Sequence, residues 1–223
     1  MTTAATLTPD EAFAKLMAGN LRFVEGTPEH PNQDAARRAD LAPGQAPFAV
    51  LFGCSDSRLA AEIIFDQGLG DLFVVRTAGH VVGPEVLGSI EYGVSVLRCP
   101  LVVVLGHDSC GAVAATRAAV ADGVVGEGYV RDVIEKVTPS VLTSIAAGYT
   151  EDRDFIAEQI RHTVRLLLDR SRILSDAVAA GDTTVVGLAY RLLDGTAELV
   201  TLEPTPGRPL TSTRPGNQAT PRS

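Results

Sequence analysis

Three apolar runs, each of strand length, constrain the fold of this chain more than any other feature. They are "APFAVLFG" (46–53), "DLFVVRTAG" (71–79) and "PLVVVLG" (100–106), and segments with a helical pattern separate them. Continuous apolar strands are typical of parallel sheets, because helices cover such sheets on both faces. The alternation therefore predicts an α/β fold with a mainly parallel central sheet flanked by helices.

The segments between and after these strands carry helix signals. Residues 84–99 begin with a proline and place five apolar side chains on one face, namely Val86, Leu87, Ile90, Val94 and Leu97. The segment "SCGAVAATRAAVADG" ends in a glycine, the usual residue just past a helix. Two long stretches after it, "YVRDVIEKVTPSVLTSIAAG" and "EDRDFIAEQIRHTVRLLLDRSRILSDAVAAG", predict further helix.

The two ends of the chain are predicted to flank a single domain over residues 1–205. Thr8, Pro9 and Glu11 indicate the capped start of a helix over about 8–25. A polar segment follows, so residues 1–45 form an N-terminal helical arm. Residues 183–203 read as two strands around an Asp-Gly turn, which predicts an antiparallel strand at the sheet edge. The tail 206–223, rich in Pro, Gly, Ser and Thr, is predicted to be disordered.

Charge and composition argue against several classes of partner. The formal net charge is −8 over 223 residues, which disfavours a general grip on nucleic-acid phosphates. No stretch is apolar for the roughly 18 residues that a membrane span needs. The first twenty residues lack the pattern of a secretory signal, and three cysteines do not suggest a disulfide framework. We therefore expect a cytoplasmic protein that binds neither nucleic acid nor membrane.

Thiol, imidazole and carboxylate groups follow two of the predicted strands. "CSDSR" (54–58) comes after the first strand, and "HDSCG" (107–111) comes after the third. Ligands of open parallel sheets bind at the carboxyl ends of the strands. If the two strands are close, Cys54, His107 and Cys110 can converge, and two thiolates with one imidazole suit zinc. The spacing alone is a weak signal, because a single cysteine is more often a small buried apolar residue.

Several similar residues are interpreted as structural. We expect Cys99 to be a packing residue, and we interpret His30 and His162 as loop and helix positions without a catalytic role. His80 also follows a strand, so on pattern alone it could be a ligand, but backbone hydrogen bonding is the favoured interpretation. Asp108 is expected to cap the helix that follows it. A phosphatase loop does not fit, because its cysteine and arginine must be farther apart than Cys54 and Arg58, which are separated by four positions.

The chain resembles the β-class carbonic anhydrases at these residues. The matching segments are "CSDSR", "VVRTAGH" and "GSIEYGVSVLRCPLVVVLGHDSCGAV", and the resemblance extends from about residue 10 to about residue 203. It implies one Zn²⁺ per subunit, bound by Cys54, His107 and Cys110. It also implies reversible hydration of CO₂ to bicarbonate by a zinc-bound hydroxide. Asp56 and Arg58 match the catalytic dyad, in which the carboxylate orients the hydroxide and the guanidinium holds the carboxylate.

The resemblance also assigns residues that line the substrate site. Gln45 matches a glutamine that hydrogen-bonds the bound anion, and Phe73 and Tyr92 match lining residues that are partly contributed across a dimer interface. Gly111 follows the last ligand and lets the backbone approach the substrate. A homodimer or homotetramer is therefore expected. Arg76 matches an arginine of a regulatory bicarbonate pocket in some relatives. The alternative role for it here is an interface salt bridge alone.

Three further expectations follow from the resemblance. Because thiolates donate more charge than imidazoles, activity should rise toward alkaline pH. Release of Asp56 by Arg58 would let the carboxylate displace the metal-bound water, and the absence of tryptophan favours the open, unregulated type. Hydrolysis of carbonyl sulfide or carbon disulfide, and a non-catalytic zinc protein, are the alternatives. The intact Asp56–Arg58 pair argues against the non-catalytic one.

Overall fold

The computed structural model describes residues 7–123 and 126–203. Its central sheet has the strand order β2-β1-β3-β4-β5. The strands are β1 (Ala49–Cys54), β2 (Leu72–Thr77), β3 (Leu101–His107), β4 (Thr184–Tyr190) and β5 (Ala197–Glu203). The first four are mutually parallel, and β5 pairs antiparallel to β4 at one edge. The predicted α/β fold with an antiparallel edge strand is thus confirmed. The tail 206–223 lies outside the described residues.

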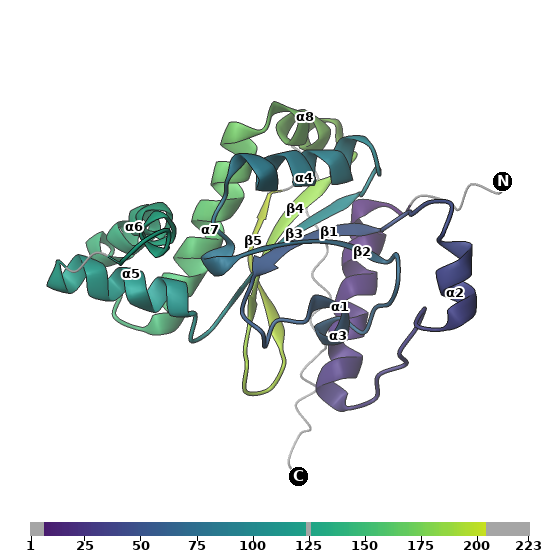
Figure 1. Cartoon of the computed structure of the whole chain (residues 1–223), viewed down its shortest axis with the longest axis horizontal. Coiled ribbons are helices and arrows are strands. Elements are labelled where there is room, and N and C mark those ends of the chain that lie inside the picture. Colours follow the sequence, from purple (N-terminus) through teal and green to yellow (C-terminus); the bar gives the residue numbers. More distant parts are fainter. Residues whose placement is uncertain (1–6, 124–125, 204–223) are drawn as a thin grey trace, which may run out of the picture.

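Helices lie on both faces of this sheet (Figure 1). One face carries α4 (Pro84–Ser95), α7 (Asp152–Arg170) and α8 (Arg172–Ala180), while α1 (Pro9–Glu25) and the short α3 (Ala61–Ile64) lie on the other. The helices α5 (Gly111–Asp122) and α6 (Val130–Ala146) project beyond the sheet as a pair. A single turn of 3-10 helix, η1 (Ala78–His80), follows β2.

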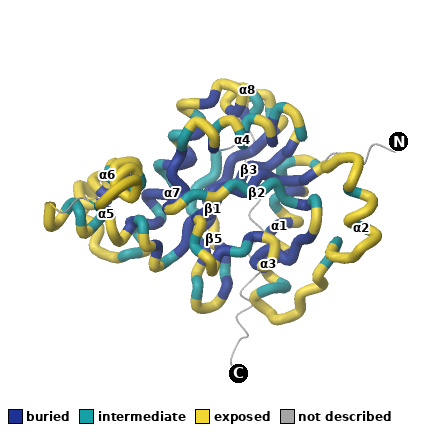
Figure 2. Tube along the Cα trace, in the orientation of Figure 1, coloured by how far each residue is buried: buried dark blue, intermediate teal, exposed yellow. Residues whose placement is uncertain are grey.

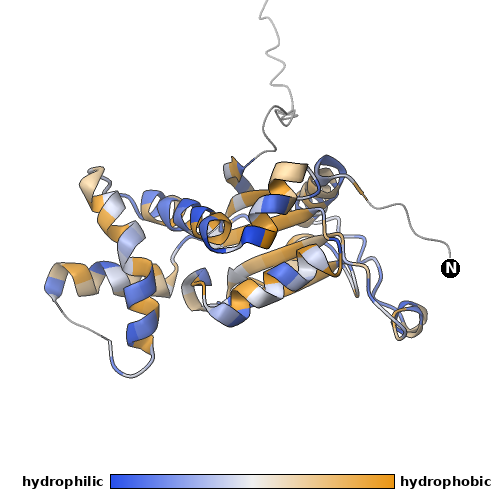
Figure 3. Ribbon diagram, turned by 90° about the horizontal axis from the view of Figure 1, so that it is seen from above, coloured by the Kyte–Doolittle hydropathy of each residue, from blue (hydrophilic) through white to orange (hydrophobic). Residues whose placement is uncertain are grey.

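The core follows from the apolar runs noted in the sequence. Every residue of β1 and β3 is buried, which explains why these strands show no polar alternation. The strands are largely orange in Figure 3, between helices whose colours alternate along their length. Figure 2 shows the same contrast in burial, with many exposed residues on α2 (Ala35–Asp40), α5, α6 and α8. Among the described residues, no helix is long and apolar enough to cross a bilayer.

The helix ends follow local rules. At α1, the Thr8 side chain accepts from the Glu11 N–H and the Glu11 carboxylate accepts from the Thr8 N–H at 2.8 Å, as the capping pattern predicts. The long segment 151–181 is two helices rather than one, because the Ser171 hydroxyl caps α8 by accepting from the Leu174 N–H. A short helix, α2, also interrupts the predicted polar loop, with Asp34 as its cap.

Two buried aspartates hold the arm that follows α1. Asp66 accepts hydrogen bonds from the backbone N–H groups of Glu29 and His30 at 3.0 and 2.9 Å, and Arg22 donates to it at 2.5 Å. Asp71 accepts from the Asn32 side chain at 2.8 Å. These bonds fix an otherwise exposed segment against the loop between α3 and β2.

Candidate metal centre

The ends of β1 and β3 bring three potential metal ligands together. The two strands are neighbours in register, with Gly53 opposite Leu105, so Cys54 and His107 reach the same edge of the sheet. Cys110 lies at the N-cap of α5, directly after the β3 loop. The ligand atoms of the three residues all lie within 4.8 Å of one another, and all three side chains are buried. The predicted convergence is confirmed.

His107 presents one particular nitrogen to the two cysteines. Its Nδ1 lies 2.8 Å from the Asp108 carbonyl oxygen, which can only accept, so Nδ1 carries the proton. Nε2 is then left with a lone pair, and it has no hydrogen-bond partner among the described residues although it is fully buried. A buried acceptor without a partner is costly, and coordination to a metal would satisfy it.

The two sulfurs lie within 4.8 Å of each other, and each affects the ionisation of the other. Hydrogen bonding from Cys110 lowers the pKa of Cys54 and raises that of Cys110, and burial raises the Cys110 pKa further. Neither residue forms a disulfide. Two sulfurs and one imidazole nitrogen match the donors that Zn²⁺ prefers, with a fourth position left for an oxygen ligand. The residues present therefore fit the metal that the resemblance implies.

Asp56 and Arg58 form a bidentate ion pair beside this cluster. The guanidinium Nε donates to Asp56 Oδ1 at 2.8 Å and Nη2 donates to Oδ2 at 2.6 Å. These bonds hold the pKa of Asp56 far below its usual value. Asp56 Oδ2 lies 3.9 Å from His107 Nε2, so the carboxylate borders the position that a metal would occupy. The carboxylate is bound to Arg58 rather than turned into the cluster.

Arg76 has a contact that sequence reasoning missed. It lies in β2, where its register partner is Gly53, and it donates to two backbone carbonyls: from Nε to Cys54 at 3.0 Å and from Nη2 to Asp56 at 2.6 Å. It thereby holds the loop that carries both functional side chains. The register of β1 and β2 was the missing information, because it places Arg76 beside that loop.

Two expectations about neighbouring residues are wrong. Asp108 does not cap α5: its carboxylate accepts from the Leu192 N–H at 3.0 Å, in the loop between β4 and β5. His80 does not bond to the backbone, because neither ring nitrogen has a hydrogen-bond partner among the described residues. Positive φ angles at Gly79 and His80 turn the ring inward against the edge of Phe52, and burial lowers the pKa of His80 to about 4.

The other cysteine and histidines lie away from the cluster. Cys99 is fully buried near the start of β3, which confirms its interpretation as a packing residue, and burial raises its pKa to about 12. His30 is exposed on the arm, and His162 is half-buried on α7. Neither belongs to the group of ligand atoms that could hold a metal.

The residues expected to line the substrate site are divided between the two ends of the sheet. Gly111 is exposed beside Cys110, with nothing within 4 Å of the place where a Cβ would stand. Phe73 and Tyr92 contact each other, with ring centroids 6.0 Å apart, but Phe73 pairs with Val50 near the other end of β1. Gln45 precedes β1 and is exposed. Since β1 is about 17 Å long, Gln45 and the cluster lie at opposite ends of this strand.

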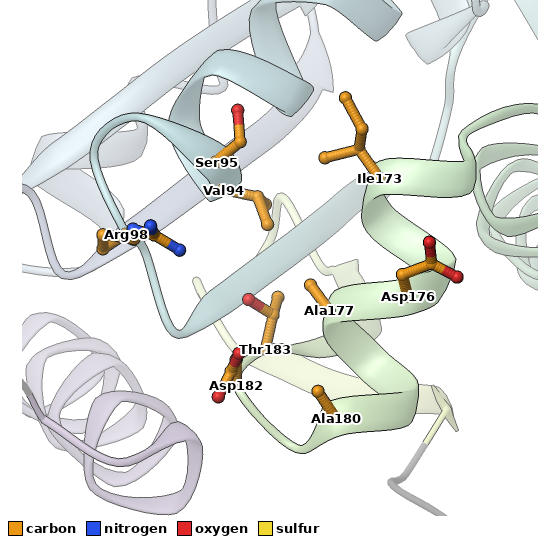
Figure 4. Close-up of a pocket in the computed structure, with 9 residues that line it drawn as sticks. All are labelled: Val94, Ser95, Arg98, Ile173, Asp176, Ala177, Ala180, Asp182 and Thr183. Atoms are coloured by element: carbon orange, nitrogen blue, oxygen red, sulfur yellow. The ribbon is translucent and has the colours of Figure 1, made fainter.

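A cavity of about 520 Å³ lies away from the cluster, between α4 and α8 (Figure 4). Ser95, Arg98, Asp176 and Asp182 supply charged and polar groups there, and Ile173 contributes an apolar side chain. It contains no cysteine or histidine. The volume of this cavity does not identify it as the active site. The chemistry expected at the Cys54–His107–Cys110 cluster involves only a few atoms and does not need a large cavity.

Comparison with known proteins agrees with the geometry. The family model described as carbonic anhydrase matches residues 49–197. Carbonic anhydrase 2 of Mycobacterium tuberculosis (strain ATCC 25618 / H37Rv) is 56% identical over 191 residues, which cover 86% of this chain and 92% of that protein. The chain belongs to the β-class carbonic anhydrase family. As a family member it is an enzyme, and the resemblance noted in the sequence is confirmed.

Solved structures of β-carbonic anhydrases share the fold. One of two tetrameric enzymes from the ascomycete Sordaria macrospora has a TM-score of 0.64 at 26% identity, covering 73% of this chain and 84% of that one. The Coccomyxa β-carbonic anhydrase in complex with acetazolamide has a TM-score of 0.65 at 23% identity, covering 91% and 90%. The central sheet and the N-terminal helix are therefore the fold of this family.

Proposed function

We propose that the chain catalyses the reversible hydration of CO₂ to bicarbonate and a proton, with one Zn²⁺ per subunit held by Cys54, His107 and Cys110. The observation that carries this proposal is the buried three-donor cluster with an ion-paired carboxylate beside it. A purely structural zinc site would close its fourth position with another cysteine or histidine. Here Asp56 lies on that side instead, and Arg58 holds it.

The residues around the cluster have separable tasks. Zn²⁺, when bound, lowers the pKa of a water molecule and so supplies a nucleophile near neutral pH. Asp56 accepts a hydrogen bond from the nucleophile and points its lone pair toward the carbon of CO₂. Arg58 keeps the carboxylate ionised and turned away from the ligand atoms, in the open arrangement. Its Nη2 also reaches the Ser109 carbonyl at 3.5 Å, which links the two loops of the site.

Arg76 and Gly111 complete the site within one chain. Arg76 sets the loop from Cys54 to Asp56 by bonding to both carbonyls. Gly111 leaves the first turn of α5 open on the side of Cys110, so that substrate can approach its backbone.

A second copy of the chain would supply the remaining lining residues. Gln45 precedes β1, and Phe73 and its contact Tyr92 lie near the start of β2, so all three are distant from the cluster of their own chain. Tyr92 is 45% exposed beside the edge strand β2. An exposed edge strand and an exposed aromatic side chain are features of a surface that pairs. We infer that a homodimer is the smallest active unit, that a homotetramer is built from it, and that it works in the cytoplasm.

The first experiment is stopped-flow CO₂ hydration by protein of measured zinc content, from neutral to alkaline pH. We expect rapid hydration that rises with pH, because two thiolates weaken the acidifying effect of the metal. Cys110→Ala should lose both zinc and activity, whereas the matched control Cys99→Ala should keep both. A zinc-loaded wild-type protein that stays inactive across this range would refute the proposal.

A further inference from the structure

The Cys54 sulfur receives a backbone hydrogen bond from a turn with little freedom to move. The N–H of Gly79, in η1, donates to Cys54 Sγ at 3.3 Å. Gly79 has φ 61° and ψ 20°, a conformation that residues with a Cβ rarely adopt. A Cβ at this position would also meet the Ala112 Cβ at 2.7 Å. Both the backbone geometry and the close packing of α5 therefore depend on glycine.

A glutamine from α7 fixes this turn from the other side. Gln159 Nε2 donates to the Gly79 carbonyl oxygen at 3.2 Å, and its own Oε1 accepts from the Ser140 hydroxyl on α6 at 2.5 Å. Gln159 and Ser140 are each about 1% exposed. A buried amide with both ends bonded holds one orientation, because rotating it would leave a buried polar atom without a partner.

We propose that Gln159 is a positioning residue for the metal centre: it locks the Gly79 turn so that the Gly79 N–H points at the Cys54 sulfur and reduces the negative charge that the sulfur donates. The chain of bonds runs from Ser140 through Gln159 and Gly79 to Cys54, and each member is buried.

The physical reason lies in the donor set. Two thiolates cancel the charge of Zn²⁺ and would leave the metal a weak acid. A hydrogen bond to a ligand sulfur withdraws part of that charge, and such outer contacts typically change metal affinity or activity by about 10- to 100-fold. This inference rests on the proposed function for its effect on rate, whereas the charge on the sulfur can be measured independently.

The test is the near-ultraviolet charge-transfer absorption from thiolate to metal in protein loaded with Co²⁺. We expect the band of Gln159→Leu to lie at longer wavelength than that of wild type, because a sulfur without its N–H donor gives up an electron more easily. Ser144→Ala is the matched control. It removes another buried hydroxyl of α6, one that donates to the Ser140 carbonyl at 3.0 Å, and should leave the band in place. The zinc form of Gln159→Leu should hydrate CO₂ about tenfold more slowly than wild type.

The outcomes separate the inference from the proposed function. A band at the wild-type wavelength in Gln159→Leu, or an equal shift in Ser144→Ala, would overturn the positioning role. An inactive wild-type zinc protein whose cobalt band still shifts in Gln159→Leu would refute the proposed function and leave the inference standing. If Gln159→Leu does not fold, Gln159→Met removes the donor nitrogen with an unbranched side chain of similar length, and the same shift is expected.

Discussion

Two aspartate–arginine pairs use the same chemical groups for different tasks. Arg58 holds Asp56 beside the metal ligands through contacts of 2.6 and 2.8 Å, and Arg22 holds Asp66 beneath the N-terminal arm at 2.5 Å. The Asp56 side chain is 18% exposed, whereas that of Asp66 is 1% exposed. Hydrogen bonds from Arg58 lower the pKa of Asp56. At Asp66, burial raises the pKa, but hydrogen bonds from backbone N–H groups and from Arg22 outweigh burial and lower it overall.

The difference lies in what else each carboxylate faces. Asp66 also accepts from the N–H groups of Glu29 and His30, so its oxygens are occupied by the fold. Among the described residues, Arg58 alone donates hydrogen bonds to the Asp56 carboxylate. One of the carboxylate oxygens borders His107 Nε2. A charged pair serves catalysis where it leaves one side of the carboxylate free, and serves stability where every side is bonded.

The largest expected effect is on the rate of Asp56→Asn. The amide keeps the size of the side chain but replaces one acceptor oxygen by a donor, so it can no longer orient the nucleophile. We expect CO₂ hydration to fall about 100-fold, with the midpoint of thermal unfolding close to that of wild type because the Arg58 half of the pair is 52% exposed. Stopped-flow rates at equal zinc content provide the measurement. A wild-type rate would place Asp56 in the same structural class as Asp66.

Asp66→Asn should show the reverse pattern. The variant removes the charge that Arg22 and two backbone N–H groups share, and hydrogen bonds to charged groups contribute about 1.5–3 kcal/mol each. We expect the free energy of unfolding to drop by about 2 kcal/mol, with the hydration rate per folded molecule unchanged. Urea denaturation and active-site-normalised rates measure the two quantities. Loss of rate without loss of stability would contradict the separation of tasks.

The features that the sequence predicted correctly depend on local pattern. The apolar runs identify β1 and β3, the capping residues identify the start of α1, and the Asp-Gly turn identifies the β4–β5 hairpin. Cys54 and His107 could be paired before the structure was known because each follows a buried strand, and parallel strands end at one edge. Their convergence was therefore predictable once the sheet was, whereas their assignment as zinc ligands came from the family resemblance.

The features that were missed depend on contacts between distant segments. Gln159 lies 80 residues from Gly79, and a glutamine within a helical pattern is usually solvated rather than buried. Arg76 bonds to the Cys54 loop only through the register of β1 and β2. Asp66 likewise accepts hydrogen bonds from His30 and Glu29, which precede it by 36 and 37 positions. Periodicity reports which face is apolar, but not which buried amide or carboxylate meets which loop.

A smaller effect is expected for Arg58→Lys. Lysine preserves the positive charge beside Asp56 but cannot form the two parallel bonds of the guanidinium. The carboxylate should then rotate more freely and orient the nucleophile less often. We expect hydration to slow about tenfold, a smaller loss than in Asp56→Asn. Arg191→Lys, at an exposed pair with Asp194 on the β4–β5 loop, is the matched control and should hydrate like wild type. Equal rates in both variants would show that charge alone holds Asp56.

The smallest effect is the acid dependence of stability that Asp66 contributes. Its pKa is lower in the folded than in the unfolded state, so its stabilisation is complete above the unfolded value of about 3.9 and is lost as pH falls through the folded value. The difference in unfolding free energy between wild type and Asp66→Asn should thus be constant from about pH 7 to about pH 5 and shrink below about pH 4. Urea titrations at each pH measure it. A difference that stayed constant into acid would mean that the hydrogen bonds to Asp66, rather than its charge, stabilise the arm, and the two pairs would then differ in mechanism as well as in task.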